Sequence, residues 1–295
     1  MESREGTYPV PEELVAVAAM TGLTLLYSAP TPGAGSRYVD GPSVAHETRM
    51  LAAVAIRGAL AGAGRQGVGE TVLEATLASR RLAGFADLRA AAFLAPLARA
   101  ALLGQTSSRV ISRLGHEEIA PFVRALDLSG EEGALGGALR LALGSGKDTT
   151  LRDAMRFAAA RDPLAREYAR NYEVTNQLAR PAMLDALSRS ESARAALVHS
   201  YLEVLAEVPD LDVVLRAGQR EADEVSRMAR GVLKAGGVYS RRGIQSISNL
   251  DGLLRADTRL SPTATEPPVG AAAFLVALEE GPGFLSYRVR PATSR

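Results

Sequence analysis

Apolar residues recur at helical spacing along most of this chain, and this periodicity constrains the fold more than any other feature. Near the N-terminus, one predicted helix face carries five of them, Leu14, Val17, Ala18, Leu25 and Leu26. Alternating patterns that would indicate strands are weak, and no segment repeats at a fixed period, which argues against a solenoid. We therefore predict an all-α protein, a single multi-helix bundle domain over residues 1–295, with 1–10 and 284–295 as peripheral or flexible tails.

Helix start and stop signals give the expected extents of the elements. We expect helices over residues 14–27, 43–61, 70–82, 87–103, 151–160, 163–178, 181–188, 212–234, 241–255 and 269–278, and another around Leu197 that is capped by Ser190. Ser129 with Glu132, and Thr150 with Asp153, have capping-box spacing. Residues 28–42 are rich in Pro and Gly, and so long a connector is often functional.

Composition and charge exclude several classes of function. The formal net charge is +1 and aromatic residues make up 5%, which argues against a partner nucleic acid or a membrane surface. Without cysteine the chain has no disulfides, thiolate chemistry or zinc–thiolate sites. The N-terminus lacks the pattern of a secretory signal, and the apolar stretch 14–27 is too short to span a bilayer, so we expect a cytoplasmic protein. Scarce cysteine, asparagine and glutamine are typical of thermophiles.

The familiar catalytic motifs are incomplete. The segment Gly144–Asp148 is reminiscent of a phosphate loop, but Leu141 stands where the motif needs glycine and Asp148 where it needs Ser or Thr. His46 precedes a glutamate but has no second histidine four residues on, which excludes a zinc-protease helix. Tyr168, Tyr172 and Tyr201 are expected to be packing residues. The residue patterns alone therefore define no catalytic centre.

From residue 149 onward, however, several motifs follow one another in a fixed order. They are Thr150–Met155, Ala160–Asp162, Ala165–Tyr168, Tyr172–Glu173, His199–Asp210, Arg216–Gly218 and Arg259–Thr265, before an alanine-rich last helix. In this order they resemble the triphosphoribosyl-dephospho-CoA synthases, especially the archaeal branch, over more than half of the chain. The N-terminal half shows weaker echoes of the family in Thr31-Pro32-Gly33, in Val39-Asp40 and around Gly84–Arg89.

Several family motifs are altered. The lysine that precedes Pro-Gly in the family is missing before Gly33, and the Gly-Gly-Asn-Thr element has lost its polar residues. Leu215-Arg216 stands where the family has Arg-Lys. The family carboxylate that follows the Gly-Thr-Thr motif is absent, and Glu266 and two prolines occupy that segment instead. Loss of one such residue typically costs orders of magnitude in rate, so four uncompensated losses leave little activity.

The resemblance implies an enzyme that joins ATP to dephospho-CoA and releases adenine, with Mg²⁺ at the triphosphate. By that resemblance we assign Asp40, Asp87 and Glu266 as catalytic candidates, with Asp40 and Asp87 also as metal ligands. The candidate residues for binding ATP are Thr31, Gly33, Arg37, Arg89, Arg216 and Thr265. The expected partner is a small nucleotide or CoA-like molecule, and a homo-oligomer stays open.

Two functions fit these altered motifs. The first is a divergent transferase that still moves a ribosyl or triphosphoribosyl group to dephospho-CoA or a related acceptor. The second is a catalytically silent paralogue that binds a nucleotide, a CoA-like ligand or a partner protein. Convergence of the residues Arg37, Asp40, Asp87, Arg216 and Glu266 on one pocket favours the first, and their scattering favours the second.

Overall fold

The computed structural model describes residues 9–41, 44–131, 133–190, 192–281 and 283, and within these ranges it is helical without a strand, as the periodicity predicts. Its helices are α1 (Glu12–Ser28), α2 (His46–Ala61), α3 (Val68–Ala83), α4 (Leu88–Leu103), α5 (Ser107–Ile111), α6 (Ile119–Ser129), α7 (Ala134–Gly144), α8 (Leu151–Ala158), α9 (Pro163–Ala169), α10 (Arg180–Ser190), α11 (Ala193–Glu207), α12 (Leu211–Ala217), α13 (Gln219–Lys234), α14 (Arg241–Ala256) and α15 (Glu266–Glu280). Short helical turns η1 (His116–Glu118), η2 (Thr175–Ala179), η3 (Gly237–Tyr239) and η4 (Thr258–Leu260) connect some of them.

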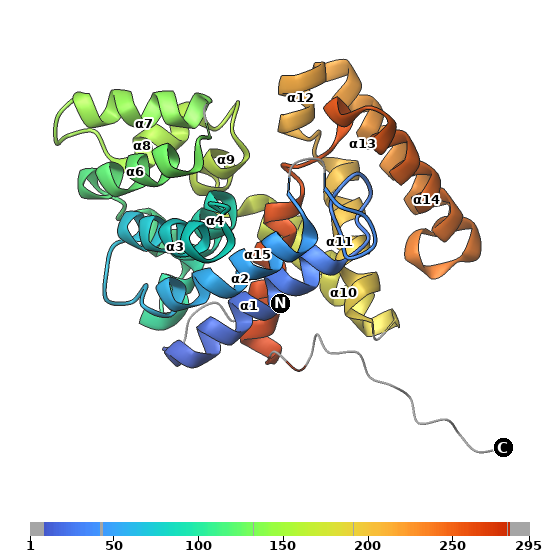
Figure 1. The fold of residues 1–295 in the computed structure, drawn as a ribbon, viewed down its shortest axis with the longest axis horizontal. Coiled ribbons are helices and arrows are strands. Elements are labelled where there is room, and N and C mark those ends of the chain that lie inside the picture. The colour runs from blue at the N-terminus through green and yellow to red at the C-terminus, as the bar shows by residue number, and fades with distance from the viewer. Residues whose placement is uncertain (1–8, 42–43, 132, 191, 282, 284–295) are drawn as a thin grey trace.

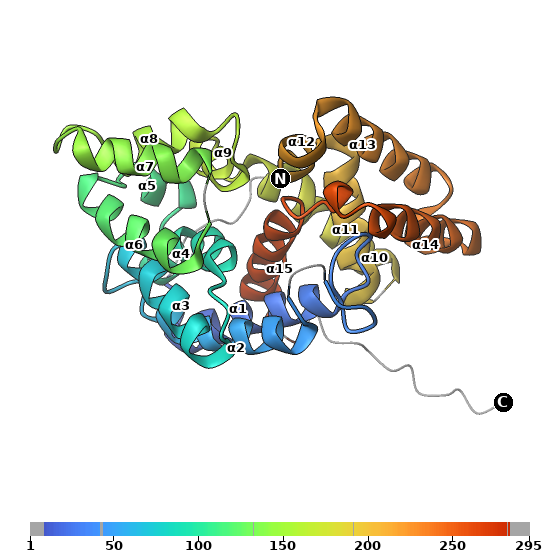
Figure 2. The same ribbon diagram turned by 45° about the horizontal axis from the view of Figure 1, so that its top comes forward.

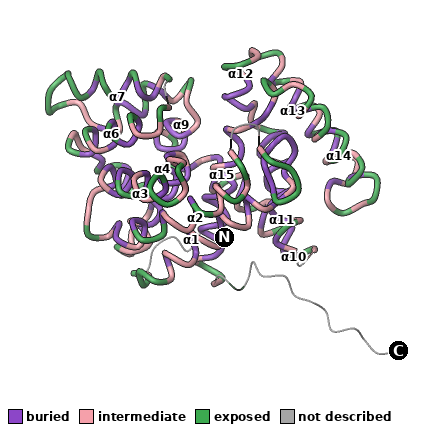
Figure 3. The backbone as a smooth tube through the Cα atoms, in the orientation of Figure 1, coloured by how far each residue is buried: buried purple, intermediate pink, exposed green. Residues whose placement is uncertain are grey.

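The helices form two groups around a central layer. Helices α3 to α9 lie on one side and α10 to α14 on the other, with α1, α2 and α15 between them (Figure 1). The turned view keeps α15 in the middle (Figure 2), and α15 is buried along most of its length (Figure 3). Gly22 allows α1 to approach α15 closely, because a Cβ at this position would lie 2.9 Å from the backbone nitrogen of Phe274.

Helix α4 contains a proline, and two buried tyrosines bond to the helix backbone beside it, one of them replacing the donor that the proline lacks. Pro96 has no N–H, so the carbonyl of Ala92, four residues earlier, loses its helical donor. The hydroxyl of Tyr168 donates to that carbonyl at 2.7 Å, and the hydroxyl of Tyr172 donates to the carbonyl of Phe93 at 2.6 Å. Both tyrosines are 0% exposed, which confirms that they are packing residues. The motif segment around α9 therefore holds α4 in place.

The break after α9 contradicts the prediction of one helix over 163–178. Asn171 and Tyr172 have positive φ angles of 53° and 61°, which end the helix and turn the Tyr172 ring toward α4. Glu167 of α9 holds the start of the next turn, η2, because its carboxylate accepts the backbone N–H groups of Val174 and Thr175 at 2.9 and 3.0 Å. The break was not predicted because neither residue is a glycine or proline, although asparagine adopts a positive φ more readily than most residues.

Other boundaries also differ from the predictions. The expected helix 212–234 is two helices, because Gly218 has a φ of 109°. Ser129 does not cap α7: its hydroxyl donates to the carbonyl of Leu126 and accepts the backbone N–H of Glu131, and α7 starts after Gly133 without a side-chain cap. Glu132, the other residue of that predicted capping box, lies outside the described residues. Ser192, rather than Ser190, caps α11. The capping box of Thr150 and Asp153 is confirmed. Helices α5 and α6 were not foreseen.

Two further predictions concern the tails and the membrane. Residues 1–8 and 284–295 of the predicted tails lie outside the described residues, whereas the backbone N–H of Val10 donates to the carbonyl of Ala101 at 3.0 Å. In the part of the chain that the structure describes, no helix combines the length and the apolar character that crossing a bilayer requires.

Replacing Tyr168 by Phe should destabilise the fold by about 1–3 kcal/mol, because the buried carbonyl of Ala92 would lose its donor. Urea denaturation would measure the change in the free energy of unfolding. The matched control is Tyr38→Phe, since the Tyr38 side chain is 55% exposed and its loss of a hydroxyl should change stability by less than about 0.5 kcal/mol. Equal stabilities for both variants would contradict the role given to Tyr168.

Candidate functional site

A cavity of about 370 Å³ opens beside the central layer. Its walls come from α1, the connector before α2, the start of α4, and the segment that leads into α15. The lining residues are Leu23, Leu26, Tyr27, Ala34, Gly35, Gly41, Val44, Arg49, Phe85, Asp87, Arg89, Ala90, Phe93, Leu94, Glu131, Arg216, Ser261, Thr263, Glu266, Pro267 and Ala271. The volume is that of a small-molecule site, and most of the wall is apolar with a few charged groups.

A chain of polar contacts runs along one wall of this cavity. Asp87 caps α4 by accepting the backbone N–H of Ala90 at 3.2 Å, and its other oxygen accepts the hydroxyl of Tyr27 at 2.6 Å. The guanidinium of Arg49 lies 3.8 Å from the centroid of the Tyr27 ring. Arg49 then pairs with both oxygens of Glu266, at 2.9 and 3.3 Å. Charged groups from α2, α4 and α15 are thereby fixed relative to one another.

The Arg49–Glu266 pair is strongly ionic. Burial lowers the pKa of the Arg49 guanidinium, but the carboxylate of Glu266 more than offsets this effect, so the pKa lies above its usual value. A planar guanidinium that holds both oxygens of a carboxylate also fixes its orientation. Glu266 therefore presents a carboxylate of defined direction at the cavity wall.

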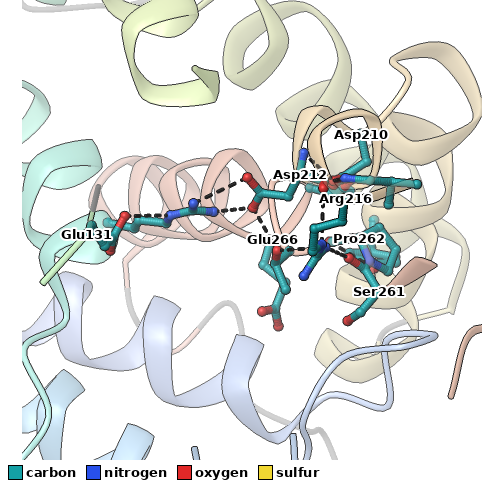
Figure 4. A network of polar contacts seen from close by, with 12 residues as sticks. Glu131, Asp210, Asp212, Arg216, Ser261, Pro262 and Glu266 are labelled. Carbon is teal, nitrogen blue, oxygen red and sulfur yellow. Dashed lines mark hydrogen bonds and ion pairs between the residues drawn. The ribbon is translucent and has the colours of Figure 1, made fainter. Parts of the chain in front are cut away.

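A second network crosses between the two groups of helices. Arg89 donates from Nε to Glu131 at 3.1 Å and from Nη2 to Asp212 at 3.3 Å, with a further contact from Nη1 to Asp212. Figure 4 shows Glu131 and Asp212 at opposite ends of this bridge. The hydroxyl of Thr263 donates to Asp212 at 2.6 Å. Burial raises the pKa of Asp212, but Arg89 outweighs burial and holds the pKa below its ordinary value.

Arg216 lies at the far end of the same network. Its Nε donates to the carbonyl of Asp212 at 3.0 Å, and its Nη2 donates to the carbonyl of Ser261. It has no close carboxylate partner among the ion pairs of the described residues. The hydrogen bonds of Arg216 thus go to neutral oxygens, although the guanidinium is close enough to Asp210 and Asp212 to lower the pKa of both carboxyl groups.

Asp210 is buried behind this network. One oxygen caps α12 by accepting the N–H groups of Asp212 and Val213 at 3.0 and 3.1 Å, and the other accepts the hydroxyl of Thr265 at 2.8 Å. Burial, followed by the negative charge of Asp212, raises the pKa of Asp210 from 3.8 to about 6. This carboxyl group therefore stabilises the loop before α15 rather than contacting the cavity.

The structure brings together four of the predicted site residues. Asp87, Arg89, Arg216 and Glu266 all line the cavity. Arg37 and Asp40 do not line it: the Arg37 guanidinium lies 5.3 Å from the Tyr38 ring, and Asp40 accepts the backbone N–H of His46 at 3.3 Å. Of the five residues whose convergence distinguishes the two functions, three meet at one pocket and these two lie outside it.

The other predicted residues support the cavity from behind. Gly33 donates its N–H to Asp251 at 2.8 Å and accepts the hydroxyl of Ser261 at 2.7 Å, with a φ of 76° that favours glycine. The side chain of Thr31 is buried. Thr265 bonds to Asp210. These three residues shape the connector and the loop that enclose the site.

Sequence reasoning missed four charged or polar residues of the site, Tyr27, Arg49, Glu131 and Asp212. Arg49 and Glu266 are 217 positions apart, and no local spacing pairs them. Asp212 had one available signal, since it lies at the start of a helix, two residues after Asp210, in the segment that carries the resemblance. Tyr27 appeared only as part of an apolar helix.

A magnesium site made by the protein alone does not fit the described residues, which contain no group of three or more acidic, histidine or cysteine side chains able to hold a metal. Each oxygen of Asp87 accepts one hydrogen bond, which leaves each oxygen a second lone pair for an ion. Mg²⁺ usually binds through one or two carboxylates together with substrate phosphates. The site therefore fits this ion only as a companion of a phosphate-bearing ligand, with Asp87 as the available carboxylate.

Comparisons with known proteins agree on one family. The family model described as ATP:dephospho-CoA triphosphoribosyl transferase matches residues 12–284. The crystal structure of a candidate triphosphoribosyl-dephospho-CoA synthase from Archaeoglobus fulgidus is similar, with a TM-score of 0.59 and 20% sequence identity, over 80% of this chain and 99% of that chain. That likeness concerns the fold. A search of curated proteins finds no match.

Asp210 should make stability depend on pH. Its contribution is fully present below the ordinary value of 3.8 and is lost as the pH rises through about 6, because the folded protein holds a proton that the unfolded chain has released. We expect the stability of the wild type relative to Asp210→Asn to fall by about 1–3 kcal/mol from pH 4 to pH 7. Urea denaturation of both proteins at the two pH values measures this difference. A difference that does not change with pH would contradict the protonated state.

Proposed function

The chain belongs to the ATP:dephospho-CoA triphosphoribosyl transferase family, and we propose that its cavity transfers the triphosphoribosyl group of ATP to dephospho-CoA with release of adenine. In this reaction a hydroxyl oxygen of the acceptor forms a bond to C1′ of the ATP ribose, and the bond from C1′ to the adenine nitrogen breaks. Adenine leaves with the bonding electrons, and the proton of the acceptor hydroxyl balances its charge. The proposed nucleotide substrate is Mg-ATP. We also propose that the protein acts in the cytoplasm.

One observation carries the proposal. A single cavity combines three arginines, three carboxylates and the rings of Phe85 and Phe93. Aromatic rings stack on bases, arginines bind phosphates, and carboxylates stabilise positive charge. Displacement at a glycosidic carbon passes through a state in which the sugar carries positive charge. The three kinds of group that this reaction needs therefore lie around one space.

The residues divide into three roles under this proposal. Glu266, oriented by Arg49, faces the ribose and stabilises its developing charge. Arg216, which is held by neutral oxygens, is the first arginine available to the triphosphate. Asp87, fixed by Tyr27, is the carboxylate available to the ion that accompanies the phosphates. Arg216 lies at the altered Arg-Lys motif and supplies positive charge there.

A silent ligand-binding paralogue is the second candidate, and one observation favours it. Arg49 and Arg89 are already paired with carboxylates of the protein, so a triphosphate would have to compete with Glu266, Glu131 and Asp212 for them. A clamp that is closed on its own side chains binds phosphates more weakly than one that is free. Catalysis of adenine release distinguishes this candidate from the transferase.

Purified protein incubated with Mg-ATP should release adenine, measured by chromatography, when dephospho-CoA is present. Adenine that requires dephospho-CoA would support the proposed transfer. Adenine from ATP alone would mean that water or another acceptor replaces dephospho-CoA. The absence of adenine in both reactions, with folded protein, would overturn the proposal in favour of the silent paralogue.

Glu266→Gln should lower the rate of adenine release by about 100-fold or more, because the neutral amide cannot stabilise positive charge at the ribose. The matched control is Glu207→Gln, which changes an exposed glutamate at the end of α11 and should leave the rate unchanged. Circular dichroism would verify that both variants are folded. A rate for Glu266→Gln within about twofold of the wild type would contradict its assigned role.

A further inference from the structure

A second cavity, of about 120 Å³, adjoins the first. The two cavities share Arg89, Phe93 and Glu131 as a common wall. The second lies where α7 and α9 face α12, between the two groups of helices (Figure 1). Leucines from α4, α6, α7, α9 and α12 line it, together with Gly136 of α7 and several charged side chains.

The lining of the second cavity disfavours phosphate. Five leucines provide much of its wall, and the charged groups are two arginines against three carboxyl groups, Glu131, Asp162 and Asp212. Arg89 is also neutralised by two of these carboxylates. An anion placed here would meet a surplus of negative charge, whereas an alkyl chain would bury apolar surface. An uncharged chain with a few polar atoms is therefore the ligand that fits this lining.

The position of the second cavity indicates which kind of ligand can carry such an uncharged arm. Side chains that line both cavities, those of Arg89 and Glu131, separate the second cavity from the larger one. Once Arg89 moves aside, one molecule can place a charged part in the first cavity and an uncharged arm in the second. The guanidinium of Arg89 is held at one end by Glu131 and at the other by Asp212 (Figure 4). The long arginine side chain has the rotational freedom that such a movement requires.

We propose that the second cavity binds the end of the pantetheine arm of the acceptor, an uncharged chain of amides and methylenes, while the reacting hydroxyl of the acceptor reaches the ATP in the larger cavity. This inference rests on the proposed function, since it takes dephospho-CoA as the acceptor. It adds an acceptor subsite formed by α7, α9 and α12, with Arg89 as its boundary.

Gly136 offers a way to fill this subsite. It lies in α7, is buried and lines the second cavity, and a Cβ at this position would meet within 4 Å only Nη1 of Arg140, at 3.1 Å, the flexible end of a side chain. Gly136→Leu therefore introduces a side chain at the cavity wall whose Cβ meets no backbone. Gly137→Leu is the matched control, because Gly137 is the next residue of α7, is exposed and has open space around it.

The test compares a ligand that carries the arm with one that lacks it. Calorimetry measures the binding of dephospho-CoA and of ADP, which represents its nucleotide half, to the wild type and both variants. We expect the wild type to bind dephospho-CoA at least about tenfold more tightly than ADP, and Gly136→Leu to remove most of that difference while its affinity for ADP stays the same. Gly137→Leu should behave as the wild type.

Three results would overturn the inference. They are equal affinities of the wild type for the two ligands, a full preference for dephospho-CoA in Gly136→Leu, and an equal loss of affinity for both ligands in that variant. Because these are binding measurements, they are independent of adenine release. If the protein releases no adenine but shows the expected binding pattern, the proposed transfer is wrong and the arm subsite is still supported.

Discussion

The hydrogen bonds from two buried tyrosines to the backbone of α4 are the interaction on which the site depends. Pro96 leaves the carbonyl of Ala92 without its helical donor, and Tyr168 replaces that donor from another helix. Tyr172, turned by its positive φ, makes the corresponding contact to Phe93. An unsatisfied carbonyl in the core would cost more than an ordinary hydrogen bond contributes, so α4 and the segment after α9 are bound to one arrangement.

The same helix carries much of the candidate site. Asp87 is its N-cap, Arg89 lies in its first turn and Phe93 lies one turn further, and all three line the larger cavity. The motifs that carry the resemblance to the family are therefore partly structural. Their tyrosines and Glu167 are fully buried and bonded to backbone, so they act on the site through α4 rather than through a ligand.

The electrostatic design of the site follows from its paired arginines. Arg49 and Arg89 are each held by carboxylates from distant parts of the chain, which orients the charges but also neutralises them. A bound polyphosphate would gain electrostatic stabilisation from Arg49 and Arg89 only by displacing their carboxylate partners, and would gain the rest from Arg216. This explains how the site can be polar and ordered, and why Arg216, whose hydrogen bonds go to neutral oxygens, is the cavity arginine outside these ion pairs.

The helical class of the fold was predictable because apolar periodicity reports burial directly, and the capping box at Thr150 was predictable because it is local. The break at Asn171 and Tyr172 was not, since tertiary contacts impose those backbone angles. The candidate site divides in the same way. Resemblance pointed to Asp87, Arg89, Arg216 and Glu266, which meet at one cavity, but it also suggested Arg37 and Asp40, which lie outside it. Arg49 needed the structure, because only the fold brings it to Glu266.

The central claim is that the larger cavity is the nucleotide site, and a crystal structure of the protein with bound ATP tests it most directly. The account predicts the adenine ring against Phe85 and Phe93, the ribose beside Glu266 and the phosphates on Arg216, with Arg89 displaced from at least one of its carboxylates. A nucleotide bound at another place, or a cavity with no nucleotide at saturating ATP, would contradict it.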